Sequence, residues 1–240
     1  MSVQVDGLTK LYGRQKAVNE ISFAAKPGRI LGFLGPNGAG KSTTMQMLTS
    51  YLHPSAGSVA ICGFDTQVQS LEVRRRIGYL PENTPLYLDM YVKEFLGFVA
   101  NTYQLKNVSL KVQQVIELVG LQDEQHKKIA ALSKGYKQRV GLAQAIIHDP
   151  EVLILDEPTS GLDPNQLIDI RSLIKKLGID KTVILSTHIM QEVEALCDDV
   201  IIINKGNVVA NGTIQDLKLQ HNSSSLEDVF RKLTLGTEAS

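Results

Sequence analysis

The stretch GPNGAGKST, residues 35–43, constrains the fold of this chain more than any other segment. It matches the pattern G-x-x-x-x-G-K-[S/T] and follows a short apolar run, RILGFL, that is typical of a strand. The segment after it, KSTTMQMLTSYL, places Met45, Leu48 and Leu52 on one face of a helix. A strand, a glycine-rich turn and a helix in this order predict a phosphate-binding loop.

The chemistry of such a loop follows from its residue types. Glycines let backbone N–H groups turn inward and surround phosphate oxygens, and the helix N-terminus adds positive potential. Lys41 is expected to reach the β- and γ-phosphates, and Ser42 to offer its hydroxyl to Mg²⁺. A dinucleotide-binding loop is the weaker alternative, because GAGKST lacks the third glycine of that pattern.

Apolar strands alternate with amphipathic helices in the rest of the chain. Strands are expected within 151–158 and 181–188, helices within 164–178 and 189–198, and a hairpin over 199–212 that turns at Lys205–Gly206. Residues from about 83 to 150 show only helical patterns, and the last stretch, SLEDVFRKL, is a short amphipathic helix. We therefore expect a single domain over 1–240, an α/β fold around a mostly parallel sheet. An α-helical subdomain is inserted at about 83–150, and a helical tail covers about 213–240.

Polar residues follow two of the buried strands. VLILDEP ends in Asp156, expected to hold Mg²⁺, and Glu157, expected to polarise an attacking water. His188 follows TVILST, where a histidine is either structural or a donor toward a γ-phosphate. The carboxyl ends of parallel strands meet at the ligand-binding edge of such a sheet, which favours the second interpretation.

A second helix start lies far from the glycine loop. In LSKGYKQRVGLAQAI, Ser133 is a capping residue, and Gly135 and several cations follow it. A helix N-terminus of this kind attracts an anion, yet its neighbourhood in the sequence offers none.

Composition excludes several function classes. The chain has 25 basic and 25 acidic residues, so no bulk charge attracts nucleic acid. Its two cysteines, Cys62 and Cys197, fit a reducing compartment. The N-terminus has no secretory apolar region, and no run approaches the ~20 apolar residues of a membrane helix. Any work at a membrane is expected to involve a partner.

Taken together, these motifs resemble the ATP-binding subunit of an ABC transporter over about residues 3–235. GPNGAGKST is similar to the Walker A loop, YLPEN to the Q-loop, LSKGYKQRV to the signature motif and LILDEP to Walker B. SGLD, residues 160–163, is similar to the D-loop and STH to the histidine switch. SLEDVF resembles the ending of ATPases paired with ABC-2-type membrane subunits, and LPENTPLY resembles the gliding-motility-associated bacterial branch.

The resemblance implies a P-loop NTPase core with an N-terminal antiparallel β-subdomain, and ATP and Mg²⁺ as cofactors. It implies ATP hydrolysis by a head-to-tail dimer that drives transmembrane permease subunits, with export favoured. The second ATP-binding subunit is an identical chain or a close homologue, and the protein is expected in the cytoplasm, on the inner face of the membrane. The implied catalytic residues are Glu157, His188 and Lys41; the metal ligands are Ser42, Glu82 and Asp156; the ATP-binding residues are Tyr12, Gly35, Pro36, Asn37, Gly38, Ala39, Gly40, Lys41, Ser42, Thr43, Ser133 and Gly135.

Three positions in these motifs carry alternatives. Glu82 replaces the usual Q-loop glutamine and is either a metal ligand or a solvated loop acid. Lys134 and Tyr136 replace a glycine and a glutamine of the signature Leu-Ser-Gly-Gly-Gln; Lys134 either attracts nucleotide or is a solvated lysine. Tyr12 is expected to stack on adenine, although a lone tyrosine beside a turn is often surface packing.

Two other functions compete with transport. A soluble ABC-type ATPase acting on nucleic acid or ribosomes would need a basic excess, a long heptad arm or a second nucleotide domain, and this sequence has none of them. A regulatory nucleotide-binding module without catalysis is disfavoured by Glu157 and His188.

Overall fold

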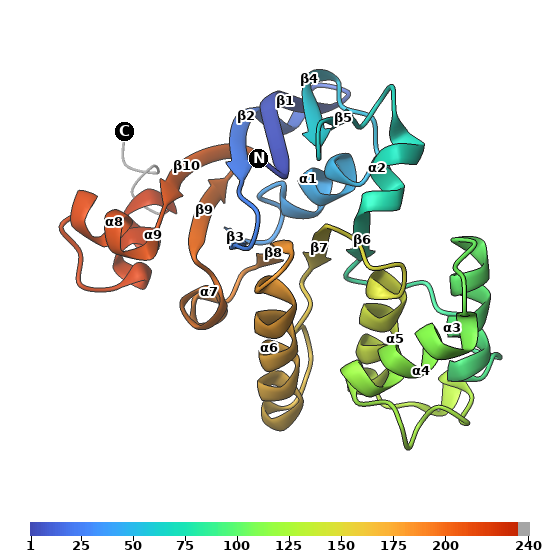
Figure 1. Ribbon diagram of the computed structural model, residues 1–240. Coiled ribbons are helices and arrows are strands. Elements are labelled where there is room, and N and C mark those ends of the chain that lie inside the picture. The colour runs from blue at the N-terminus through green and yellow to red at the C-terminus, as the bar shows by residue number, and fades with distance from the viewer. Residues whose placement is uncertain (235–240) are drawn as a thin grey trace.

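A six-stranded sheet forms the centre of the protein, which a computed structural model describes over residues 1–234 (Figure 1). The strand order is β10-β9-β3-β8-β7-β6. The strands are β3 (Ile30–Leu34), β6 (Ile77–Leu80), β7 (Val152–Asp156), β8 (Thr182–Thr187), β9 (Asp199–Asn204) and β10 (Asn207–Gly212). All neighbours pair in parallel except β9 and β10, which form an antiparallel hairpin. The carboxyl ends of β3, β6, β7 and β8 therefore meet at one edge.

Both faces of this sheet are buried, as continuous apolar strands predict. Along β7, Leu153 and Leu155 belong to one apolar cluster, whereas Val152 and Ile154 belong to another. Successive side chains of a strand point to opposite faces, so each cluster lies on its own side of the sheet. Apolar packing on both faces of the sheet therefore fixes the strand ends at which the polar residues Asp156 and His188 lie.

The second sheet is antiparallel and contains the N-terminus. Its order is β2-β1-β4-β5, with β1 (Val3–Tyr12), β2 (Gln15–Ala25), β4 (Ala56–Ile61) and β5 (Phe64–Asp65). Phe23 of β2 packs against Phe33 of β3 with ring centroids 5.3 Å apart, which joins the two sheets. Helix α1 (Lys41–Leu48) lies under the blue strands of Figure 1, and α2 (Ser70–Arg76) leads into β6.

The residues between β6 and β7 form helices that gather at one side of the molecule (Figure 1). They are α3 (Val92–Thr102), α4 (Val108–Val119), a short 3-10 turn η1 (Ile129–Ala131) and α5 (Lys134–Ile146). The three α-helices contact one another, and α5 also packs on β6. Phe95, Ile116 and Leu142 come from these helices and join the cluster that contains Leu153.

The remaining helices follow the later strands. They are α6 (Pro164–Gly178), α7 (Met190–Leu196), α8 (Ile214–Gln220) and α9 (Leu226–Thr234). Helix α6 begins where the sequence predicts it, because the Asp163 side chain accepts hydrogen bonds from the N–H groups of Asn165 and Gln166. Leu226 and Val229 of α9 pack with Val193 of α7 in a third apolar cluster.

The structure confirms the α/β fold class, with its mostly parallel sheet, its antiparallel N-terminal sheet and its helices between β6 and β7. It also confirms the helix over 164–178 and the hairpin turn at Lys205–Gly206. The assignment of 1–240 to one domain, with an insertion at about 83–150 and a tail at about 213–240, stays a prediction. Residues 235–240 of that tail lie outside the described residues.

Gly32, in the middle of β3, generates a stability prediction. A Cβ atom there would lie 2.7 Å from Cys197 Sγ, but 3.4 Å from Cys197 Cβ and 3.5 Å from Val193 Cγ1. Gly32→Ala is therefore expected to lower the free energy of unfolding by about 1–3 kcal/mol, the usual cost of overpacking. Cys197→Ala removes only the clashing sulfur, so the double variant should lose less stability than the sum of the single variants. Urea unfolding of all four proteins measures this coupling, and additive losses would contradict the explanation.

Candidate functional site

The glycine loop between β3 and α1 folds around the side chain of Lys41. Lys41 is only 6% exposed, and its Nζ donates hydrogen bonds to the carbonyl oxygens of Gly35 at 2.8 Å and Pro36 at 3.2 Å. Gly40 has φ 105°, and a Cβ atom there would lie 2.5 Å from the Ala17 carbonyl oxygen. Glycine is thus required at the residue that precedes α1, for both conformation and space.

A cavity of about 810 Å³ opens over this loop. It lies at the carboxyl edge of the central sheet, where α1 begins. Its lining residues are Tyr12, Gln15, Lys16, Ala17, Asn37, Gly38, Gly40, Lys41, Ser42, Thr43, Glu82, Glu157, Ser160, His188, Lys205 and Gly206. The structure thus brings most of the predicted nucleotide and catalytic residues together from segments far apart in the sequence.

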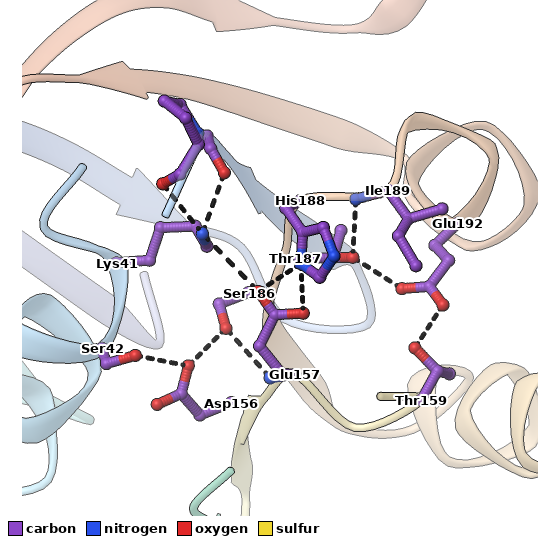
Figure 2. A network of polar contacts seen from close by, with 12 residues as sticks. Lys41, Ser42, Asp156, Glu157, Thr159, Ser186, Thr187, His188, Ile189 and Glu192 are labelled. Atoms are coloured by element: carbon purple, nitrogen blue, oxygen red, sulfur yellow. Dashed lines mark hydrogen bonds and ion pairs between the residues drawn. The ribbon is translucent and has the colours of Figure 1, made fainter. Parts of the chain in front are cut away.

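Asp156 ends β7 and is almost fully buried. Its Oδ1 accepts hydrogen bonds from the hydroxyls of Ser42, at 3.2 Å, and Ser186 (Figure 2). Ser186 lies directly opposite Asp156 in the register of β7 and β8. One carboxylate oxygen therefore joins the start of α1 to the end of β8.

Glu157 is the first residue after β7, and its side chain is buried beside His188 and Lys41. His188 Nδ1 lies 3.0 Å from Glu157 Oε2, and Lys41 Nζ lies 3.5 Å from Glu157 Oε1. The Glu157 backbone has φ 49°, an uncommon value for a residue other than glycine. Two hydrogen bonds from its N–H, to the carbonyl oxygen and the hydroxyl of Ser186, hold this conformation. Such over-determined backbone strain is typical of functional sites.

Tyr12 and Glu82 lie at the rim of the cavity. Tyr12 is 51% exposed, and Lys10 Nζ lies 5.6 Å from its ring centroid. Glu82 is exposed and lines both this cavity and a second one. Both positions are compatible with the predicted roles in adenine stacking and metal binding.

Ser133 and Gly135 are not among the lining residues of this cavity in the described part of the chain. Ser133 caps α5 as predicted, because its hydroxyl accepts a hydrogen bond from the Tyr136 N–H at 3.4 Å. Lys134 extends over Gly161, where a Cβ atom would collide with its amine. This contact favours neither of the two alternatives raised for Lys134, because it ties the lysine to its own chain's 160–163 segment.

A second cavity, of about 820 Å³, lies between the central sheet and helices α3 and α5. Ser42, Glu82 and Asp156 line it, so it reaches the same metal-ligand candidates from the other side. Three further lining residues have buried side-chain atoms without a hydrogen-bond partner: Ser50 Oγ, Gln144 Oε1 and His148 Nδ1. All three atoms are buried within the wall of this cavity and do not face its open space.

His148 is the titratable residue of that wall. Its ring stacks on Tyr103 with centroids 3.9 Å apart, and its Nε2–H donates to the Ile77 carbonyl oxygen at 2.9 Å. Burial lowers the pKa of His148 below its usual value. The neutral ring is favoured because protonation would place an N–H at Nδ1, where no acceptor lies within hydrogen-bond distance among the described residues.

Comparison with known proteins identifies the family of this chain. The family described as ABC transporter matches residues 18–160. The ABC transporter ATP-binding protein NatA of Bacillus subtilis (strain 168) is 39% identical over 219 residues, covering 90% of this chain and 89% of that protein. The bacitracin transport ATP-binding protein BcrA of Bacillus licheniformis is also 39% identical, covering 90% of this chain and 71% of that protein.

Solved structures agree with this result. The structure of an ATP-binding subunit of an ABC transporter has a TM-score of 0.89 at 28% identity, covering 97% of this chain and 99% of that chain. A dimeric post-hydrolysis state of an ATP-binding cassette, bound to ADP and Pi, has a TM-score of 0.80 at 25% identity, covering 88% and 98%. The chain belongs to the ABC transporter family, as an ATP-binding ATPase. The first cavity, called the nucleotide cavity below, contains the glycine loop at which the sequence predicts ATP binding.

Some residues of the site were not singled out in the sequence. Ser186 stands in the apolar strand TVILST, where its hydroxyl is the one signal for a role at the strand end. Gln15, Lys16 and Lys205 line the cavity from the N-terminal sheet and the β9–β10 turn, and no sequence pattern indicated them. Within residues 1–234, no helix has both the length and the apolarity needed to cross a membrane.

The environment of His148 generates a pH prediction. Because its pKa is lowered in the folded protein, the unfolded chain binds a proton first as pH falls below about 6.5. This contribution to stability is complete above that pH and is lost as pH falls toward the folded-state value. His148→Phe, which keeps a ring against Tyr103, should show a smaller loss of stability between pH 7 and pH 5. Urea unfolding midpoints test this, and identical pH slopes for both proteins would contradict it.

Proposed function

We propose that this chain is the ATP-hydrolysing subunit of an exporter and that two chains close head to tail on two ATP molecules. The observation that carries the proposal is the separation of the two halves of the predicted site. Lys41, Ser42 and Glu157 line the nucleotide cavity, whereas Ser133 and Gly135 begin α5 outside it. A helix N-terminus attracts an anion. In a head-to-tail dimer that anion is the γ-phosphate of an ATP bound to the other chain.

Magnesium fits the residues where the start of α1 meets the end of β7. Mg²⁺ takes oxygen ligands at about 2.1 Å in near-octahedral geometry, so neighbouring ligands lie roughly 3 Å apart. Ser42 Oγ and Asp156 Oδ1 are 3.2 Å apart and suit two neighbouring positions, with Glu82 as a further oxygen ligand. When bound, the ion would neutralise charge on the phosphate oxygens.

The other side chains supply positioning and electrostatics, which dominate phosphoryl transfer. Lys41 binds the β- and γ-phosphates from inside the glycine loop, and Tyr12 stacks on adenine at the rim. Glu157 orients the attacking water and accepts its proton. His188 Nδ1 lies 3.0 Å from Glu157 Oε2, so the histidine holds that carboxylate beside the γ-phosphate.

Coupling to permease subunits is assigned to the second cavity. It shares Ser42, Glu82 and Asp156 with the metal site, and its other wall belongs to helices α3 and α5. A permease segment inserted there would contact residues of the segment after β6, such as Asn83 and Pro85, beside the metal-ligand candidate Glu82. Motion of the helices on ATP binding would reach the membrane subunits by this route. The expected location, in the cytoplasm at the inner face of the membrane, follows from that partnership.

The relatives favour export over the alternatives. One is named for bacitracin transport and another, from Burkholderia orbicola (strain AU 1054), for Nod factor export. A soluble ATPase acting on nucleic acid or ribosomes is disfavoured by the formal net charge of zero. Assignment to the gliding-motility branch stays a prediction, as does pairing with an identical chain or a close homologue.

Glu157→Gln tests the proposed base. A general base contributes about 10²–10⁴-fold to such reactions, so ATP hydrolysis should fall at least 100-fold while ATP binding remains. The variant should also accumulate as an ATP-bound dimer, measured by light scattering after size-exclusion chromatography. Glu151→Gln, an exposed change just before the same strand, is the control and should hydrolyse normally. Hydrolysis by Glu157→Gln at the parent rate would remove this role.

Ser133→Arg tests the composite site. Arginine is larger than serine and positively charged, so it should block the nucleotide site of the partner chain. Hydrolysis should then be abolished, while ATP binding to the monomer is spared. Ser109→Arg, on the exposed surface of α4, is the matched control. Mixing Ser133→Arg with Lys41→Ala should restore phosphate release, because each mixed dimer contains one site without either change. Normal hydrolysis by Ser133→Arg alone would contradict the head-to-tail arrangement.

A further inference from the structure

A buried carboxylate lies beside the nucleotide site without lining its cavity. Glu192, on α7, is 0% exposed. Its Oε1 accepts a hydrogen bond from the Thr159 hydroxyl, and its Oε2 accepts one from the Thr187 hydroxyl at 2.7 Å (Figure 2). Burying a carboxylate is costly unless hydrogen bonds compensate it. A buried acid at this position therefore calls for a role beyond packing.

The hydrogen bonds of Thr187 have a defined direction. The Ile189 N–H donates to Thr187 Oγ1 at 3.0 Å, so this oxygen already accepts one hydrogen bond. Its own proton points to Glu192 Oε2. His188 lies between Thr187 and Ile189 in the chain. The backbone on both sides of the histidine is thus fixed through one hydroxyl and one carboxylate.

The other carboxylate oxygen holds the segment that follows Glu157. Thr159 comes two residues after Glu157 and directly before Ser160, which lines the nucleotide cavity. The intervening Pro158 carbonyl oxygen accepts a hydrogen bond from Gln138 of α5 at 2.9 Å. Glu192 therefore joins the end of β8 to the loop after β7, at the level where His188 meets Glu157.

We propose that Glu192 is a positioning residue that fixes His188 against Glu157. The two hydrogen bonds to Glu192 tie together the two backbone segments that carry these side chains. Loss of either one frees the His188 segment from the Glu157 loop and lengthens the 3.0 Å contact between Nδ1 and Oε2. This inference rests on the proposed roles of Glu157 and His188 in hydrolysis.

Glu192→Gln is the first test, because it keeps the volume of the side chain and replaces one acceptor oxygen with an NH₂ group. We expect kcat for ATP hydrolysis to fall about tenfold or more, with KM for ATP within twofold of the parent. Glu194→Gln is the matched control on the same helix, where an exposed carboxylate lies 3.5 Å from Lys218 Nζ. An unchanged kcat in Glu192→Gln would overturn the inference.

A double-variant cycle with His188→Ala separates positioning from a general loss of structure. If Glu192 acts through His188, adding Glu192→Gln to His188→Ala should leave kcat where His188→Ala alone puts it. Independent effects that multiply would overturn the inference. A fully active His188→Ala variant would instead refute the proposed role of His188 in hydrolysis. Glu192 would then have no catalytic group to position.

Thr187→Val keeps the proposal testable if the Glu192 variant does not fold. It removes the hydroxyl next to His188 and leaves Glu192 its bond from Thr159. We expect the same pattern, a lower kcat with KM nearly unchanged and no further loss in the His188→Ala background. A Thr187→Val protein with the parent kcat would overturn the inference.

Discussion

The parallel pairing of β7 with β8 is the constraint on which the rest of the site depends. Its register sets Asp156 opposite Ser186. Glu157 follows Asp156 directly after β7, and Thr187 follows Ser186 at the end of β8. Backbone hydrogen bonds and two buried faces hold this register, because a slip of one residue would move each side chain into the core on the opposite face, where the packing does not match it. The sheet therefore places Asp156 and the start of each following segment, whereas the contact between Glu157 and His188 also depends on the hydrogen bonds of the two segments after the strands.

Two cavities share Ser42 and Glu82, and in the proposed function this shared boundary couples nucleotide to partner. Asp156 lines the cavity on the side of helices α3 and α5 and accepts a hydrogen bond from Ser42. Coupling in this proposal needs no long pathway, because Ser42 at the start of α1 and Glu82 after β6 line both cavities.

Sequence reasoning succeeded where the determinant is local or where one pattern carries the chemistry. The glycine loop, the helix start at Asp163, the cap at Ser133 and the hairpin turn at Lys205–Gly206 all follow from neighbouring residues. The role of Ser186 does not follow from neighbouring residues, because its partners, Asp156 and the Glu157 N–H, lie about thirty residues away along the chain. The position of the Lys134 side chain likewise depends on Gly161, which comes from another segment.

The sequence alone determined the family, the α/β class, the phosphate loop and the identity of the acidic pair, because strand and helix periodicities and glycine requirements act over a few residues. The tertiary structure decided which of these meet. It placed Glu157 within reach of His188 and Lys41, left Ser133 outside the cavity, and buried Glu192 between two threonines. Those contacts join segments distant in the chain, and only the packing of the sheet against its helices sets their distances.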